Sequence, residues 1–179
     1  DNLGDWSSDV CSSDLLNLRD KIKLGASGKI VSAFDIASVL AIGADWANSA
    51  RGFMFAIGCI QSQSCHTNKC PTGVATQDPL RQRALVVPDK AQRVFNFHRN
   101  TLKALAEMLA AAGLEHPSQL SAKHLVRRMS ATEIKLFSQL HVFLKPGELL
   151  TGEVNGEFYS RMWQMARADS FEPHEVVAA

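Results

Sequence analysis

The first third of the sequence alternates short apolar runs with glycine-containing turns. Residues 22–24 suit a short strand, and the sequence at 25–28 suits a tight turn after it. Apolar residues then recur over 34–42 at a spacing that predicts a buried helix. Residues 45–49 have little strand propensity of their own, but a second turn at 50–52 follows them, so we predict another strand there. This order corresponds to one β/α unit and the start of the next.

Beyond the loop that ends near Pro79, the pattern becomes helical. Over 88–112 the apolar residues fall on one stripe, between a proline near the start and a glycine just past the end, which predicts a long helix. A shorter helix is predicted at 117–129. The sequence at 130–133 has the spacing of a capping box and predicts a third helix that extends through Leu144. A last helix is predicted over 158–168, so this part of the chain is expected to be mostly α-helical.

Composition and charge narrow the classes of function. Apolar residues make up 46% of the chain and charged residues 21%, which is typical of a globular protein rather than a disordered one. The net charge of +1 gives no electrostatic argument for nucleic-acid binding. No stretch of roughly 20 apolar residues without charges is present, so we predict no membrane span. The sequence shows no secretory signal pattern, and we expect a cytoplasmic protein.

The first fifteen residues differ in character from the rest. They are rich in Ser and Asp, they have no helical or strand period, and the composition changes at Leu16. The heptapeptide at 9–15 resembles a translated sequencing adapter. We therefore predict that residues 1–15, including Cys11, are not native sequence and that the natural chain begins upstream.

Three cysteines, Cys59, Cys65 and Cys70, lie in one polar loop. Clustered thiols in a chain without a secretory signal are expected to hold a metal rather than to form disulfides. Thiolate ligands suit iron–sulfur clusters, zinc or copper, and three ligands suit a 3Fe-4S cluster. Pro71, directly after the third cysteine, is typical of bacterial cluster loops. Two alternatives stay open on chemistry alone: structural zinc with His66 as fourth ligand, and plain buried cysteines.

The sequence at 58–77, GCIQSQSCHTNKCPTGVATQ, resembles the cluster loop of glutamate synthases. The family pattern is Gly-Cys, five residues, Cys-His, three residues, Cys, and then Thr-Gly-Val-Ala-Thr-Gln. All three cysteines and the whole segment at 72–77 coincide with it. The neighbouring sequence at 78–87 and the helical tail are similar to the branch called FMN-binding glutamate synthase-like proteins.

This resemblance implies a (β/α)8 TIM barrel, of which the chain would be a C-terminal fragment with the last two β/α units. Strand seven would lie near 22–24 or 30–31, and strand eight near 46–50. Residues 16–79 would then form the end of the barrel together with the iron–sulfur loop. Residues 80–179 would form a helical C-terminal extension.

The resemblance also implies FMN, because such barrels commonly bind phosphate in the loops after strands seven and eight. The residues that match these two turns are Ser27, Gly28 and Lys29 in the first and Ala50, Arg51 and Gly52 in the second. Arg51 would add charge-assisted hydrogen bonds. The chain departs from the family at both turns: relatives often have an acid before paired glycines at 27–29, and others carry a small residue in place of Arg51.

By resemblance, electrons enter at the 3Fe-4S cluster and pass to FMN, which reduces 2-iminoglutarate, formed from 2-oxoglutarate and ammonia, to L-glutamate. The implied partners are an electron donor, either ferredoxin or an NADPH-oxidising subunit, and a glutaminase domain or subunit that releases ammonia from glutamine. Hydrogen bonds to the cluster sulfurs are expected from the polar loop residues Ser62, Ser64, Thr67 or Asn68.

The substrate-binding and catalytic residues are expected in the earlier barrel units, so we predict that this fragment is inactive alone. Two other functions remain open. One is an N-methylglutamate synthase-like subunit, which uses the same barrel with a different amine. The other is a non-enzymatic, zinc-stapled helical interaction module, in which the cysteines only hold structure.

Overall fold

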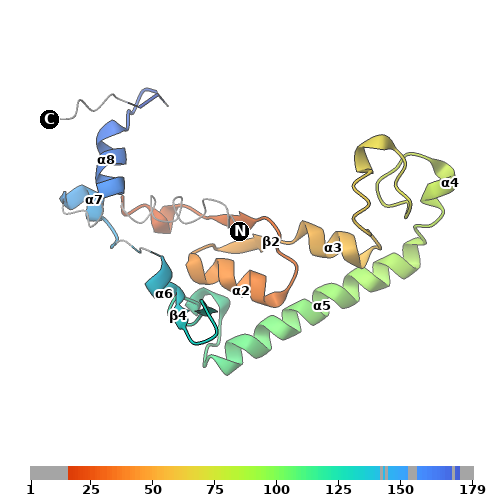
Figure 1. Ribbon diagram of the computed structural model, residues 1–179, viewed down its shortest axis with the longest axis horizontal. Helices are drawn as coiled ribbons and strands as arrows, with labels where there is room; N and C mark the ends of the chain where they lie inside the picture. The colour runs from red at the N-terminus through yellow and green to blue at the C-terminus, as the bar shows by residue number, and fades with distance from the viewer. Residues whose placement is uncertain (1–15, 142, 144, 153–156, 171, 174–179) are drawn as a thin grey trace.

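The computed structural model describes residues 16–141, 143, 145–152, 157–170, 172 and 173 (Figure 1). The adapter-like segment 1–15 lies outside the described residues. The helices and strands are β1 (Gly25–Ser27), α2 (Ala33–Ile42), β2 (Trp46–Asn48), α3 (Ala50–Ala56), α4 (Pro79–Gln82), α5 (Val87–Ala111), β3 (Val126–Arg128), β4 (Ile134–Leu136), α6 (Phe137–Leu140), α7 (Glu148–Thr151) and α8 (Glu157–Met165). The 3-10 turns are η1 (Arg19–Lys21), η2 (Cys65–Thr67) and η3 (Pro117–Gln119).

The segment from β1 to β2 is a β/α/β unit. The two strands are parallel, with Ser27 opposite Asn48, and α2 connects them. A capping box starts α2, because the Ser32 hydroxyl accepts the Asp35 N–H at 3.2 Å while the Asp35 carboxylate accepts the Ser32 N–H at 2.8 Å. Gly43 ends the helix at φ 121°, a conformation that glycine adopts without strain. The predicted order of strand, helix and strand is therefore confirmed.

The first strand lies between the two positions predicted for it, three residues after 22–24 and before 30–31. The sequence at 25–28 predicts a turn, but residues 25–27 are the paired residues of β1. Gly25 can pair there because the indole of Trp46 lies against it, where a larger side chain would collide with the ring. The side chain of Asp45 accepts the Leu24 N–H at 2.8 Å and so draws the incoming chain toward β2.

The long helix predicted over 88–112 is confirmed as α5. Its apolar stripe packs on α2, where Leu105 and Leu109 form a buried cluster with Ala33 and Ala37. The small alanine side chains let the two helices approach closely. Toward its N-terminal end, α5 packs against α3. The long helix therefore contacts both α2 and α3 (Figure 1).

The helices predicted at 117–129 and from 130–133 to Leu144 are wrong for the described residues. The chain instead forms η3, the antiparallel pair β3 and β4, and the short helix α6. The sequence at 130–133 is the hairpin turn, in which the Met129 N–H donates to the Glu133 carbonyl at 2.9 Å. Leu125 and Phe137, on either side of the hairpin, are buried with Ala41 of α2, and this burial outweighs the local helical pattern. Leu144 lies outside the described residues.

The chain is therefore a mixed α/β structure with two small sheets and several helices. The last predicted helix is confirmed as α8, with bounds close to 158–168. Within the part of the chain that the structure describes, none of the helices has the length and apolar character needed to cross a membrane.

Candidate functional site

The two glycine-containing turns predicted to bind phosphate lie next to each other. Because β1 and β2 are adjacent and parallel, their carboxyl ends meet at one edge of the sheet. The Ser49 hydroxyl, just after β2, donates to the Ile30 carbonyl in the turn after β1 at 2.8 Å. Residues 27–29 and 50–52 are therefore neighbours in space although about twenty residues separate them in sequence.

The first turn has the backbone shape of an open cradle. Gly28 has φ 111° and Lys29 has φ 53°, so two successive residues depart from the usual negative φ. A Cβ added at Gly28 would meet nothing within 4 Å, which means that the glycine is required for its conformation rather than for space. Ser27, Gly28 and Lys29 are all exposed. Such a turn can direct backbone N–H groups toward an anion.

The second predicted turn is in fact the first turn of α3. Ala50 and Arg51 are exposed there, and Gly52 is buried. The N–H groups of a first helical turn have no partner inside the helix, and they favour phosphate oxygens. Together with the cradle at 27–29, this arrangement fits a phosphate group.

Gly52 has a second role that the sequence did not reveal. A Cβ at this position would lie 2.6 Å from the Phe97 ring and 2.8 Å from the Ser49 hydroxyl. The Phe97 ring packs edge-to-face on Phe53, with ring centroids 5.2 Å apart. Gly52 therefore allows α5 to approach α3, and this packing holds the second turn in place.

The cysteine loop extends from the end of α3 to α4 and occupies one end of the molecule (Figure 1). Cys59 is half-buried and its N–H donates to the Met54 carbonyl at 2.9 Å, Cys65 is exposed in η2, and Cys70 is only 6% exposed. All three are free thiols. Among the described residues, no three His, Cys, Asp or Glu side chains stand close enough to hold a metal ion, so the three predicted ligands are not gathered into one set.

The Cys70 sulfur is surrounded by hydrogen-bond donors. The Thr72 hydroxyl lies 3.5 Å from it, and the backbone N–H groups of Ala75, Thr72 and Val74 also donate to it. These hydrogen bonds, led by that of the Thr72 side chain, lower the pKa of the Cys70 thiol to about 7. The segment after Cys70 thus wraps the sulfur and favours its thiolate form, which is the form that binds metals.

Cys59 also has a backbone donor, because the Gln61 N–H lies 3.5 Å from its sulfur. The polar side chains that we expected to bond the sulfurs have other partners in the described structure. The Ser62 and Ser64 hydroxyls bond each other at 2.8 Å, and the Thr67 hydroxyl donates to the Ser64 carbonyl. The groups that donate to the sulfurs are mainly backbone N–H groups, and a pattern of side chains does not predict them. The Thr-Gly sequence after Cys70-Pro71 is the one sequence signal that could have indicated these donors.

Asn68 fastens the two halves of the loop. It has φ 62°, and its side-chain oxygen accepts the Gln77 N–H at 2.6 Å and the Thr76 hydroxyl at 2.9 Å. Helix α4 supports the loop from outside, since the Gln82 amide donates to the Thr76 carbonyl at 2.8 Å. Gly73, at φ 76°, leaves no room for a Cβ because the Arg81 carbonyl oxygen occupies that space. The loop is therefore held in a defined shape by its own residues.

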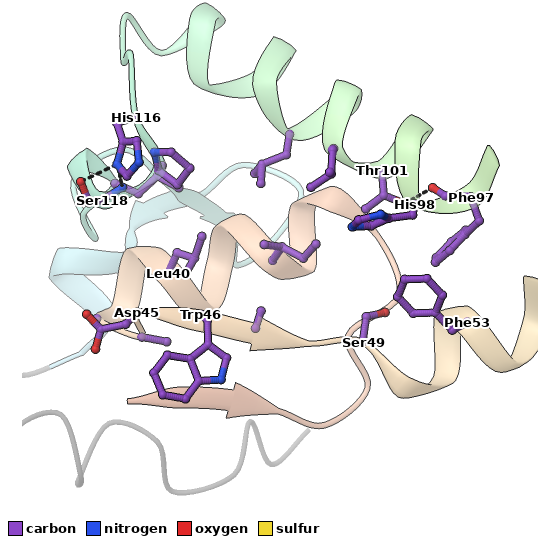
Figure 2. A pocket seen from close by; sticks show the side chains of 18 of the residues that line it. Leu40, Asp45, Trp46, Ser49, Phe53, Phe97, His98, Thr101, His116 and Ser118 are labelled. Atoms are coloured by element: carbon purple, nitrogen blue, oxygen red, sulfur yellow. Dashed lines mark hydrogen bonds between the residues drawn. The ribbon is translucent and has the colours of Figure 1, made fainter. Parts of the chain in front are cut away.

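Two hollows lie in the described structure. A cavity of about 470 Å³ between β2, α2, α5 and η3 is lined mainly by apolar side chains, with Phe53 and Phe97 facing each other at one end and Trp46 and Asp45 at the other (Figure 2). It contains none of the predicted site residues. A more open hollow of about 770 Å³ lies beside the cysteine loop, between Cys65 and the segment 73–75 that surrounds the Cys70 sulfur. Of the three cysteines, Cys65 alone lines this hollow, so the space does not gather the thiols, and only the residue types of the loop fit a thiolate-held centre.

Comparisons with known proteins find similarity to glutamate synthases. A family model described as the conserved region in glutamate synthase matches residues 12–115. The chain is 44% identical over 128 residues to the glutamate synthase large subunit-like protein YerD of Bacillus subtilis, covering 71% of this chain and 24% of that protein. It is 36% identical over 99 residues to ferredoxin-dependent glutamate synthase 2 of Synechocystis, covering 55% of this chain and 6% of the relative.

A third relative is the archaeal-type glutamate synthase [NADPH] of Dehalococcoides mccartyi, which is 30% identical over 122 residues, or 66% of this chain and 24% of the relative. The chain therefore spans a quarter or less of the length of these three proteins.

Proposed function

Because this chain belongs to the glutamate synthase family, we propose that it forms part of an enzyme that reductively aminates 2-oxoglutarate to L-glutamate in the cytoplasm. The observation that carries the proposal is the Cys70 sulfur, which is buried and enclosed by the donors of the family-specific segment 72–75. A structural cysteine in a helical module would not require several donors aimed at its sulfur.

We propose that residues 16–79 are the last two β/α units of a TIM barrel with its cysteine loop, and that 80–179 form a C-terminal extension. The parallel pairing of β1 with β2 supports this, since parallel neighbours joined by a helix are the unit from which such barrels are built. A two-stranded parallel sheet also leaves both outer edges to be paired by further strands.

In this arrangement, the FMN phosphate would be held by Ser27, Gly28 and Lys29 on one side and by Ala50, Arg51 and Gly52 on the other. Backbone N–H groups of the cradle and of the first turn of α3 would donate to its oxygens. Arg51 and Lys29 would add positive charge at the same edge. The Ser49 bond to Ile30 keeps the two turns at a constant separation.

Cys59, Cys65 and Cys70 would hold the 3Fe-4S cluster. When bound, the cluster and the flavin supply the electrons and the hydride that convert 2-iminoglutarate to L-glutamate. The loop residues would keep Cys70 deprotonated, limit access of water to its sulfur and hold Cys59 at the end of α3, close in the chain to the phosphate turn. The donor would be ferredoxin or an NADPH-oxidising subunit, and ammonia would come from glutamine through a glutaminase domain or subunit.

Anaerobic purification of the full-length protein tests this proposal. We expect iron, acid-labile sulfide and FMN in the wild type, and loss of iron and sulfide with retention of FMN in Cys70→Ser. Ser62→Ala is the control and should retain both cofactors, because the exposed Ser62 hydroxyl bonds Ser64 rather than a sulfur. One zinc per chain without sulfide would support the zinc-stapled module instead. Faster turnover with methylamine than with ammonia would favour the N-methylglutamate synthase-like alternative.

A further inference from the structure

The hairpin of β3 and β4 has an open edge. At its base, the Phe137 N–H donates to the Leu125 carbonyl at 3.0 Å, and Val126 then stands opposite Leu136. Backbone groups alternate in direction along an antiparallel strand, so the N–H and C=O groups of Val126 and Arg128 point away from β4. In the described part of the chain this sheet has two strands, and these groups on the outer side of β3 are therefore available to a further strand.

The two faces of the hairpin differ in chemistry. On one face Arg127 stands directly opposite Lys135, where two like charges repel each other. Lys135 has an ion pair with Glu133 at 3.0 Å, whereas Arg127 forms none with the described residues. The other face carries Val126 and Ile134, whose exposed fractions are 54% and 63%. The hairpin thus presents positive charge on one face and apolar surface on the other.

This composition selects the kind of strand that the edge can accept. Charged side chains at a sheet edge hinder pairing with neutral strands, and positive charges hinder pairing with basic ones. Acidic side chains next to Arg127 would instead remove the repulsion between Arg127 and Lys135. Because a strand directs successive side chains to opposite faces, the same strand would place apolar residues beside Val126.

We propose that the outer edge of β3 binds an extended segment of a partner protein in which acidic and apolar residues alternate. The backbone of Val126 and Arg128 supplies the hydrogen bonds, and Arg127 selects the acidic side chains. A strand of three residues offers few such bonds, so the complex is transient and sensitive to salt. The inference is independent of the proposed function, since the hairpin includes neither the cysteine loop nor the two glycine-containing turns.

Fluorescence anisotropy with the full-length protein tests this proposal. The probe is a labelled synthetic peptide of alternating Glu and Val, and a peptide of the same composition with the Glu and Val residues in two blocks is the control. We expect tighter binding of the alternating peptide, and weaker binding as the salt concentration rises. N-methylation of every second peptide nitrogen should abolish binding, because it removes the donors to the β3 carbonyls while the protein stays unaltered.

Charge reversal identifies the edge that binds. Arg127→Glu should weaken binding of the alternating Glu and Val peptide about tenfold. The double variant Arg127→Glu, Lys135→Glu should instead bind a peptide of alternating Lys and Val, a gain that requires a folded hairpin. Arg93→Glu is the matched control, because Arg93 is exposed on α5 and forms no ion pair with the described residues. It should leave the affinity for both peptides unchanged.

Each other result refutes the proposal. Wild-type protein that does not bind the alternating peptide would overturn it. Equal binding of the block or N-methylated peptide, or equal weakening by Arg93→Glu, would show a general attraction to acidic chains and overturn it as well. A dimer that Arg127→Glu dissociates, together with no binding of the peptide, would assign the edge of β3 to a second copy of this chain instead.

Discussion

The two phosphate-type turns and the cysteine loop are held by contacts of different range. The turns depend on contacts between residues 19 to 24 apart, such as the Ser49 bond to Ile30 and the Asp45 bond to Leu24. In the loop, Asn68 and Arg81 bond partners 8 to 12 residues away. A short motif can therefore specify the loop, whereas the turns require the whole β/α/β unit and α5. We therefore expect substitutions in the loop to act mainly on nearby residues, and substitutions in the turns to act through contacts with distant elements.

The largest effect is expected from Gly73→Ala in the loop. The added methyl would meet the Arg81 carbonyl oxygen, a backbone atom of α4 that cannot move without displacing that helix. We expect a loss of unfolding free energy on the order of 3 kcal/mol and loss of bound iron. Gly113→Ala is the control, since Gly113 has nearly the same φ, 73° against 76°, but nothing within 4 Å of the new Cβ.

Chemical denaturation measures both variants. The control should lose only about 1 kcal/mol, the cost of a left-handed backbone with a side chain. Equal losses would show that the contact with Arg81 is without consequence.

A smaller effect is expected from Gly52→Ala at the second turn. The new methyl would press on the edge of the Phe97 ring, which can move at a cost of about 2 kcal/mol. The strain arises between α3 and α5. Gly52→Ala should therefore lower the stability less in the Phe97→Leu background than in the wild type. Thermal melts of the four proteins in this cycle give the coupling. Additive effects would mean that the helix contact does not control the turn.

The smallest effect is expected from Asp45→Asn. Partial burial acts to raise the pKa of Asp45, but the Arg19 guanidinium at 2.9 Å, the Leu24 N–H and Lys23 outweigh it and hold the pKa below the ordinary value of 3.8. The unfolded chain then binds the proton more tightly, so the stabilisation is complete above about pH 4 and disappears as pH falls through the folded-state pKa. We expect Asp45→Asn to lower the free energy of unfolding by about 1 kcal/mol at pH 7.

Denaturation of the wild type and Asp45→Asn at several pH values checks this prediction. The difference between them should shrink below pH 4, and Asp20→Asn, an exposed acid in η1, should show little difference at any pH. A difference in unfolding free energy that stays constant down to pH 2 would mean that Asp45→Asn removes packing contacts rather than the effect of the charge.

The parts of the fold that could be predicted were those whose signals are local and repeated. Helix α5 has an apolar stripe, a proline at its start and a glycine after its end, and it formed as predicted. The hairpin of β3 and β4 could not be found this way, because the capping-box spacing at 130–133 also suits a turn. Burial of Leu125 and Phe137 against α2 decided between the two. The shift of β1 has a similar cause, since Trp46 and Asp45 select the paired residues.

From the sequence by itself came the family, the three cysteines and the two glycine-containing turns, because each depends on residue type at close spacing. Only the tertiary structure decided that the turns are neighbours, that Gly52 serves helix packing, and that backbone N–H groups enclose Cys70. The physical reason is that these contacts join residues distant in sequence or involve backbone groups, which every residue carries and no composition reveals.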